Sequence, residues 1–198
     1  MPREFENQDE ILTWADSLDE RWPERIEVRA GIVDVVRSLR CSQATIVELC
    51  SGDGRLARQI LQTVPDARYI GIDASESLCV YVRQQLGIET VRADLRESHW
   101  TSSFDTAIDA ILTLQSMHDV GGPAMIEQLY ASSLDALSAE GRLVAADFVV
   151  DEEAYDSEKA GRLPIAWHLD KLQSLGFGNV RCEIVAGKLA CFVGERLP

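Results

Sequence analysis

The sequence predicts an α/β fold built on a doubly wound, seven-stranded sheet, and three observations support that prediction. Short apolar runs with the composition of buried strands alternate with segments whose apolar residues recur at helical spacing. Most consecutive runs are joined by connections long enough to hold a helix, so the strands should be parallel. The last two runs are separated by only two residues, which allows only an antiparallel hairpin. We therefore expect a mostly parallel sheet with helices on both faces and an antiparallel C-terminal hairpin.

Two amphipathic helices are expected before the first strand. The first covers residues 8–20, and the second starts at Pro23, because proline is favoured in the first turn of a helix. Their apolar faces consist of Ile11, Trp14, Ala15 and Leu18 in the first helix and of Ile32, Val35, Val36 and Leu39 in the second. These helices therefore occupy the 44 residues that precede the first strand.

Seven strands with intervening helices are expected in the rest of the chain. The strands cover residues 45–50, 68–73, 89–93, 107–115, 142–147, 178–185 and 188–195. Ser75 can cap the helix after the second strand, and Gly87 can end it. The Gly-Gly-Pro sequence at 121–123 should open a helix that runs through Leu137, and Glu-Gly at 140–141 should turn the chain into the fifth strand.

The C-terminal hairpin carries a specific prediction about strand pairing. If Ala186-Gly187 forms its two-residue loop, residues 185 and 188 pair, and counting back places Cys182 opposite Cys191. Two such side chains would share one face of the sheet, with their Cβ atoms about 4.5–5.5 Å apart. In a reducing compartment both should remain thiols.

Length and composition restrict the class of protein. At 198 residues and 46% hydrophobic, the chain can bury one sizeable core, so we expect one domain over residues 1–198, with N-terminal helices in 1–40 and the α/β core in 41–198. The formal net charge of −14 disfavours nucleic acid and anionic lipid as partners. The N-terminus has no cationic apolar leader, and no segment reaches about 20 consecutive apolar residues, so we expect a cytoplasmic protein without a membrane partner. Its five cysteines fit no zinc spacing, and no metal is assigned.

The most informative segment is residues 46–54, with the sequence Ile-Val-Glu-Leu-Cys-Ser-Gly-Asp-Gly. An apolar strand ends there in an acid and two glycines separated by one residue, and a helical pattern follows. This order brings backbone N–H groups and a helix N-terminus against a small charged ligand at the carboxyl edge of the sheet. The segment therefore predicts a site for a nucleoside cofactor.

Five landmarks in a fixed order make this prediction more specific. They are Glu48-Leu-Cys-Ser-Gly52-Asp-Gly54, Asp73 at the end of the second strand, Asp94 after the third, Gln115-Ser-Met-His118-Asp119 after the fourth, and Glu-Gly-Arg-Leu-Val-Ala-Ala-Asp147 at the fifth. Over residues 30–198 the chain resembles class I S-adenosylmethionine-dependent methyltransferases of the compact, single-domain, small-molecule type. The resemblance implies a Rossmann-like methyltransferase fold and methyl transfer from S-adenosylmethionine to a small-molecule acceptor, with S-adenosylhomocysteine as the product. It also implies that the N-terminal helices fold over the active site as a lid.

The resemblance implies a set of cofactor contacts. These fall on Glu48, Cys50, Gly52, Asp53, Gly54, Asp73, Ala74, Asp94, Leu95, Thr113 and Leu114. Asp73 lies 19 residues after Gly54, near the offset of about 20 residues at which an acid meets ribose hydroxyls. The family pattern places Glu48 beneath the glycine loop or near the cofactor's amino group, and Asp94 at the adenine amino group. Cys50 departs from the family, which usually has glycine there.

Candidate residues for the transfer step lie at the ends of the fourth and fifth strands. His118 could act as a general base or orient the acceptor, and Asp147 should face the same cleft. A loop histidine hydrogen-bonded to the backbone explains His118 equally well. Gln115, Trp14 and Trp22 are candidates for the acceptor pocket, although core packing is the alternative for tryptophan.

Two alternative functions remain open. Gly52-Asp-Gly54-Arg-Leu-Ala57 also satisfies the Gly-x-Gly-x-x-Ala pattern of NAD(P)-binding oxidoreductases, although the long segment before the first strand and the hairpin argue against that class. The other alternative is a non-catalytic module that binds S-adenosylmethionine or a partner, which the short connection from 148 to 163 favours. The sequence makes no prediction of oligomeric state.

Overall fold

The structure is a computed structural model that describes residues 2–39, 41, 43–97, 100–104, 107–154 and 160–198. Its helices are α1 (Gln8–Arg21), α2 (Glu24–Arg37), α3 (Arg55–Thr63), α4 (Glu76–Leu86), α5 (Met117–Val120), α6 (Pro123–Ala136) and α7 (Ile165–Leu175), with 3₁₀ turns η1 (Trp100–Ser103) and η2 (Glu152–Ala154). Its strands are β1 (Thr45–Leu49), β2 (Arg68–Asp73), β3 (Glu89–Arg92), β4 (Ile108–Leu114), β5 (Leu137–Phe148), β6 (Gly178–Ala186) and β7 (Leu189–Glu195). Part of the connection from 148 to 163 lies outside the described residues.

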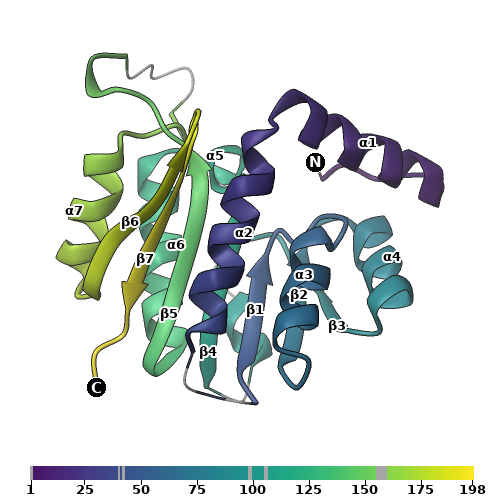
Figure 1. Cartoon of the computed structure of the whole chain (residues 1–198), viewed down its shortest axis with the longest axis horizontal. Helices are drawn as coiled ribbons and strands as arrows, with labels where there is room; N and C mark the ends of the chain where they lie inside the picture. The colour runs from purple at the N-terminus through teal and green to yellow at the C-terminus, as the bar shows by residue number, and fades with distance from the viewer. Residues whose placement is uncertain (1, 40, 42, 98–99, 105–106, 155–159) are drawn as a thin grey trace.

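The seven strands form one sheet in the order β3-β2-β1-β4-β5-β7-β6 (Figure 1). The strands from β3 to β5 are parallel, whereas β7 is antiparallel to both of its neighbours. The predicted fold class, a doubly wound α/β sheet with an antiparallel C-terminal hairpin, is confirmed. The order reverses between β1 and β4, and such a reversal opens a crevice at the carboxyl ends of the strands.

Helices cover both faces of the sheet, because neighbouring residues of the inner strands point to opposite sides. In β1, Ile46 packs with the residues of α1 to α4, whereas Val47 packs with those of α5, α6 and α7. The helix α1 lies across the carboxyl ends of β1 and β2 (Figure 1). The two expected N-terminal helices are therefore present, and one of them stands over the crevice.

Local signals fix the ends of several helices as the sequence predicts. The Ser75 hydroxyl accepts a hydrogen bond from the Leu78 N–H at 3.3 Å and caps α4. Gly87 ends the same helix in the left-handed conformation, with φ +68°. Pro123 occupies the first turn of α6.

The boundary between α6 and β5 differs from the prediction. The helix ends at Ala136 and the strand already starts at Leu137, so no separate turn precedes it. Leu137 pairs with Ile108, but Arg142 pairs with Ala110, so the extra residues of β5 form a bulge. Glu140 adopts φ +65° in this bulge. The Glu-Gly pair therefore bends a strand rather than preceding it.

The predicted pairing of the two hairpin cysteines is wrong. The loop is Gly187-Lys188, one residue later than expected, because Ala186 still pairs with Leu189. The shifted loop alone places Ile184 opposite Cys191, and an irregularity between Cys182 and Ile184 then places Cys182 opposite Phe192. Cys182 and Cys191 consequently pack on opposite faces of the sheet. Gly187 adopts φ +56°, a conformation that favours glycine, and this requirement determines the position of the turn.

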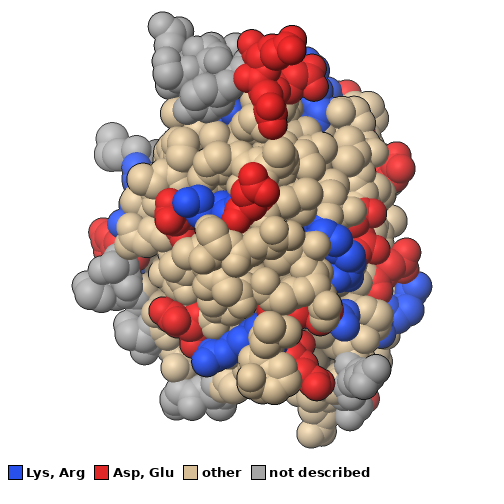
Figure 2. Space-filling model, turned by 90° about the vertical axis from the view of Figure 1, so that its left-hand side faces the viewer, with Lys and Arg blue, Asp and Glu red and all other residues tan. Residues whose placement is uncertain are grey.

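Charged side chains of both signs lie on the surface of the molecule. On the described part of the face in Figure 2, acidic and basic side chains are interspersed and no continuous basic area is visible. None of the helices within the described ranges is both long and apolar enough to cross a bilayer.

Candidate functional site

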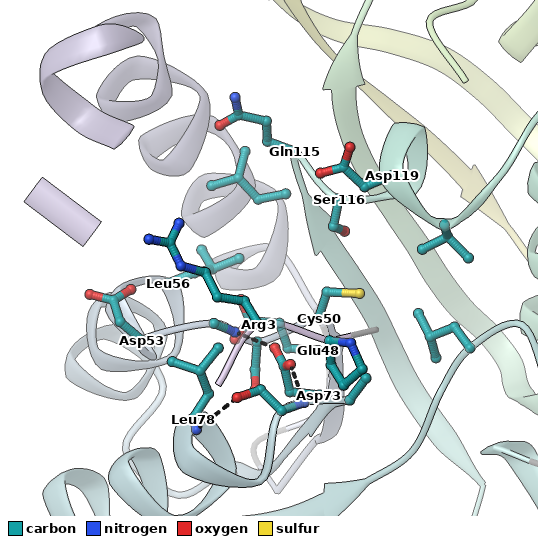
Figure 3. A pocket seen from close by; sticks show the side chains of 18 of the residues that line it. Arg3, Glu48, Cys50, Asp53, Leu56, Asp73, Leu78, Gln115, Ser116 and Asp119 are labelled. Carbon is teal, nitrogen blue, oxygen red and sulfur yellow. Dashed lines mark hydrogen bonds between the residues drawn. The ribbon is translucent and has the colours of Figure 1, made fainter. Parts of the chain in front are cut away.

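A cavity of about 510 Å³ lies at the carboxyl ends of β1, β2 and β4, beneath α1 and the start of α2 (Figure 3). The predicted residues that line it are Trp14, Glu48, Cys50, Gly52, Asp53, Asp73, Ala74, Asp94, Leu95, Leu114 and Gln115. The predicted residues that do not line it are Trp22, Gly54, Thr113, His118 and Asp147. Most of the predicted cofactor contacts thus converge on one space, as expected for the ends of neighbouring parallel strands.

The glycine loop after β1 is held against the end of β2. Gly52 adopts φ +55°, and its N–H donates to Asp73 Oδ2 at 3.0 Å. A Cβ on Gly54 would lie 3.0 Å from Leu86 and 3.2 Å from Val82. Gly52 therefore borders the cavity, whereas Gly54 allows α4 to pack closely on the loop and does not itself line the cavity.

Cys50 is strained at the position where the resemblance implies glycine. Its φ is +55°, a conformation that side chains other than glycine rarely adopt. Burial raises the pKa of its thiol to about 12, so the sulfur stays protonated.

Two carboxyl groups end β1 and β2 and point toward the cavity (Figure 3). Asp73 accepts hydrogen bonds from the N–H groups of Gly52 and Ser75, each at 3.0 Å, and burial raises its pKa. Glu48 accepts a hydrogen bond from the Tyr69 hydroxyl at 2.8 Å. Because Glu48 is only 4% exposed, burial raises its pKa to about 8. Glu48 is therefore mainly protonated at neutral pH.

The far end of the cavity is bordered by the segment after β3. Asp94 accepts a hydrogen bond from Arg96 Nε at 2.8 Å, and this bond, above all, lowers the pKa of Asp94 to about 2. Leu95 is buried beside it. Arg96 also lines the cavity and was not predicted, because it lies on the surface in a segment without regular structure.

The loop after β4 brings the two predicted catalytic residues together. His118 Nδ1 lies 2.7 Å from Asp147 Oδ1, and the His118 N–H donates to Asp147 Oδ2 at 3.0 Å. Burial opposes protonation of His118, but the bond and charge of Asp147 outweigh it and raise the histidine pKa. Neither residue lines the cavity, although Ser116 and Asp119, which flank His118 in sequence, do. The pair therefore stands directly behind the cavity wall.

The two tryptophans proposed for the acceptor pocket have different surroundings. Trp14 lines the cavity, 3.7 Å from where a Cβ on Gly52 would lie, and its ring contacts Phe5. Trp22 instead packs edge-on against Phe148, with 4.8 Å between ring centroids. Thr113, which also does not line the cavity, is buried, and its Oγ1 lies at hydrogen-bond distance, 2.6 Å, from Ser116 Oγ. Of the two tryptophans, only Trp14 has the position expected of an acceptor residue.

Sequence reasoning missed the charged residues that the N-terminal region brings to the cavity. Arg25 and Arg29 of α2 line it, together with Arg55 of α3, and Asp19 of α1 bonds all three. Burial opposes ionisation of Asp19, but these guanidinium groups lower its pKa to about 2. The i,i+4 spacing of Arg25 and Arg29 was the available signal, since it places both on one face of the helix.

The segment before α1 also reaches the cavity. Pro2 and Arg3 line it, and the Glu4 carboxylate accepts hydrogen bonds at 3.0 Å from the N–H groups of Glu76 and Ser77. The Ser77 N–H bond is the main reason why the pKa of Glu4 is lowered to about 2. Glu4 therefore caps α4 and holds the N-terminal segment against the start of that helix.

The described residues contain no group of three or more His, Cys, Asp or Glu side chains arranged to hold a metal ion. The strand order, the glycine loop and the carboxylates at successive strand ends instead define an α/β protein built to hold a nucleoside cofactor.

Comparisons with known proteins show which proteins the chain is similar to. Residues 46–141 match the model of a methyltransferase domain family. The release factor glutamine methyltransferase of Streptomyces coelicolor is 30% identical over 94 residues, which cover 46% of this chain and 33% of that protein. Over these residues the chain is similar to methyltransferases.

Solved structures support the fold. Human N-acetylserotonin methyltransferase in complex with SAM superposes with a TM-score of 0.70 at 13% identity, over 97% of this chain and 57% of that one. A chain from the complex that contains the Haloferax volcanii Trm112 methyltransferase activator superposes with a TM-score of 0.67 at 14% identity, over 97% of this chain and 100% of that one. This chain spans one third of the curated relative and just over half of the human enzyme.

Proposed function

We propose that this chain binds S-adenosylmethionine in the cavity and transfers its methyl group to a small-molecule acceptor, with S-adenosylhomocysteine as the product. The observation that carries the proposal is the convergence of the Gly52 loop, Asp73 and Asp94 on one cavity of about 510 Å³. Its volume lies within the range of about 300–1,000 Å³ that is usual for small-molecule sites.

The residues present fit the parts of this cofactor. Asp73 can accept hydrogen bonds from ribose hydroxyls, and Asp94 can accept one from the adenine amino group. The absence of a side chain at Gly52 leaves room for the methionyl group, and Glu48 can pair with its ammonium group. These contacts account for a nucleoside with an amino-acid tail better than for a dinucleotide, so the NAD(P) alternative is not favoured.

The cofactor supplies the activated methyl group and its own leaving group, so the chain's main task is positioning. Leu114, Gln115 and Ser116 border the end of the cavity where the acceptor would enter. The role that we assign to the walls there is to align the acceptor, and such alignment is worth about 7–11 kcal/mol at best.

His118 is proposed as the base for acceptors that must lose a proton. Asp147 holds its Nδ1 at 2.7 Å and so fixes the tautomer in which Nε2 can accept a proton. Nε2 lies 3.4 Å from Asp119, a residue of the cavity wall. A small movement of this loop would bring Nε2 to the acceptor.

A small acceptor suits the volume of the cavity, about 510 Å³, and the acidic composition, with a formal net charge of −14. The relative from Streptomyces coelicolor is named for a protein acceptor, which makes a glutamine side chain the second class to test. The assay is S-adenosylhomocysteine release with a panel of phenols, carboxylic acids, amines and glutamine peptides. We expect release with at least one small molecule and none with the peptides. Release with peptides alone would overturn the acceptor class.

The non-catalytic alternative is tested in the same assay. If the protein binds S-adenosylhomocysteine but no acceptor in the panel is methylated, while a known methyltransferase turns over under the same conditions, methyl transfer is not its function. NADH at equal concentration serves as the ligand control.

A further inference from the structure

The connection from β5 to α7 packs directly on the loop that carries His118. A Cβ on Gly161 would lie 2.4 Å from the His118 carbonyl oxygen and 2.5 Å from the His118 Cα, so the two backbones are in contact. The same Cβ would lie 2.8 Å from the carbonyl oxygen of Gly121. The next side chain along the connection, that of Arg162, therefore starts beside the proposed base.

Arg162 and His118 contact the same aromatic ring. The guanidinium carbon of Arg162 lies 4.4 Å from the centroid of the Phe148 ring, within the range of a cation–π contact. The His118 ring packs edge-on against that ring, with 4.9 Å between the centroids. Besides burial, the positive charge of Arg162 acts to lower the pKa of His118, against the stronger effect of Asp147. The two groups are therefore neighbours across Phe148.

The charge of Arg162 is not matched by an acid within the part of the chain that the structure describes. In those ranges its guanidinium makes no ion pair and no hydrogen bond, and the side chain is only partly exposed. The acidic groups beside His118 face the histidine instead, with Asp147 2.7 Å from Nδ1 and Asp119 3.4 Å from Nε2. The donors of Arg162 are therefore available to a ligand that reaches the base.

An unpaired guanidinium favours an anion of matching geometry. Its N–H groups form a rigid fork that fits two oxygens of a carboxylate or of a phosphate. A carboxylate carries the single negative charge that one guanidinium balances. A phosphate carries more than one charge at neutral pH and would be repelled more strongly by Asp119 and Asp147. The surroundings therefore favour a carboxylate.

The position of Arg162 suits the acceptor rather than the cofactor. Asp119 and Val120, in the loop on which Gly161 packs, line the cavity, whereas Arg162 lies outside it (Figure 3). The proposed cofactor contacts of Gly52 and Asp94 lie on other strand ends. A molecule with its reacting atom at His118 Nε2 could therefore extend past this loop and place its other end at Arg162.

We propose that Arg162 binds a carboxylate of the acceptor, so that the substrate is a small carboxylic acid with a hydroxyl or amino group as its methylated group. The inference rests on the proposed function and deepens it, because it names the substrate class. In the transfer, the proton of that group passes to His118 Nε2, and the oxygen or nitrogen forms a bond to the methyl carbon. The bond from that carbon to the cofactor's sulfur breaks, and its electron pair stays on the sulfur. The carboxylate remains bound to Arg162 unchanged.

The test detects anion binding through His118 and does not require the natural acceptor. The full chain, saturated with S-adenosylhomocysteine, is titrated with benzoate at millimolar concentrations while the imidazole signals are followed by NMR. The chain has three histidines, and the signals of His118 are assigned with His118→Asn. Benzamide is the uncharged match of benzoate, and phenyl phosphate is the other anion. The forms compared are wild type, Arg162→Gln, Arg162→Lys and the control Arg58→Gln. Arg58 is an exposed residue of α3 that does not line the cavity.

We expect benzoate to shift the His118 signals saturably in wild type and in Arg58→Gln, and to bind about tenfold or more tightly than benzamide, as a charged, two-bond contact predicts. Arg162→Gln should lose most of this preference by weakening benzoate alone. Arg162→Lys keeps the charge without the fork and should fall between the two. In the release assay, kcat/KM should show the same order for hydroxybenzoates and aminobenzoates against the corresponding benzamides.

Benzoate that leaves the His118 signals of the wild type unchanged, or that shifts them equally in Arg162→Gln, would overturn the inference. Tighter binding of phenyl phosphate than of benzoate would overturn the choice of a carboxylate. If Arg162→Gln does not fold, the comparison of benzoate with benzamide in wild type and in Arg162→Lys still decides the question. All of these results leave the cofactor assignment intact, whereas failure of S-adenosylhomocysteine to bind would refute the proposed function itself.

Discussion

The two ends of the cavity differ in how completely their buried polar groups are paired. At the cofactor end, Arg29 Nε and Ser51 Oγ lack partners among the residues the structure describes, and Glu48 is buried in its neutral form. Behind the acceptor end, Asp147 accepts three hydrogen bonds from His118 and Phe148 and is 1% exposed. Buried polar groups in folded proteins are normally paired, so the incomplete end is the one that a ligand is expected to complete.

The difference suggests two modes of action. The cofactor end should change its hydrogen bonds and protonation when the ligand binds. At the acceptor end, the hydrogen bonds between His118 and Asp147 are already formed and should stay unchanged when the loop brings Nε2 to the acceptor. Substitutions at each end should therefore separate binding from turnover.

The largest expected effect is on turnover. His118→Asn should lower kcat by about 100-fold or more with an acceptor that must lose a proton, because general-base catalysis contributes on that scale. Affinity for S-adenosylhomocysteine should not change, since His118 does not line the cavity. In wild type, kcat/KM should rise with pH through the raised pKa of His118, and the variant should lack that step. A variant with the wild-type rate and pH profile would show that the His118–Asp147 pair is only structural.

A smaller effect, on affinity alone, is expected at the end of β2. Asp73→Asn keeps the size of the side chain but weakens its bonds to the Gly52 and Ser75 N–H groups and the bond proposed to the ribose. Calorimetry should show S-adenosylhomocysteine binding about 10- to 100-fold more weakly, as for loss of hydrogen bonds to a charged group. Asp94→Asn should reduce this affinity less than Asp73→Asn does, because Asp94 is more exposed and already paired with Arg96. The reverse order of the two losses would contradict the assigned roles.

Glu48→Gln should weaken ligand binding and stabilise the folded protein. In the unfolded chain this carboxyl ionises near pH 4.5, whereas in the folded protein its pKa is about 8. Wild-type stability without ligand should therefore fall as pH rises between these values, and the variant should lack this loss. Denaturant unfolding should find the variant more stable by a margin that grows with pH and reaches up to about 4 kcal/mol at pH 8. The affinity of Glu48→Gln for S-adenosylhomocysteine should be about tenfold lower than that of the wild type. If the free energy of unfolding depends on pH in the same way in wild type and variant, Glu48 is ionised in the folded protein.

The smallest effect concerns the strained Cys50. Cys50→Gly should relieve the left-handed backbone and raise stability by about 1 kcal/mol, while S-adenosylhomocysteine binds a few-fold more tightly. Cys50→Ala is the matched control, because it removes the sulfur and keeps the strain. A gain in affinity that is the same in both variants would attribute the effect to the thiol's bulk rather than to the backbone.

The cofactor end was largely predictable from sequence because its parts are local. The glycine loop, Asp73 and Asp94 each follow a strand directly, and parallel strands bring those ends together without further information. Arg29 and Glu4 could not be predicted, because their contacts depend on how α1, α2 and the preceding segment pack over the sheet. The same limit explains the hairpin: its loop moved by one residue to use the left-handed conformation of Gly187, and this shift already separates the two cysteines. His118 and Asp147 were each named as candidates, but their contact at 2.7 Å is a property of the fold.

Binding of S-adenosylhomocysteine, measured by calorimetry at pH 7.5 in two buffers of different ionisation enthalpy, tests the central claim most directly. The account predicts one molecule bound per chain, with a heat that depends on the buffer because the ligand's ammonium group drives a proton from Glu48. Absence of binding at millimolar ligand would contradict the claim that this cavity holds the methyl donor. Binding that Asp73→Asn leaves unchanged would contradict it as well.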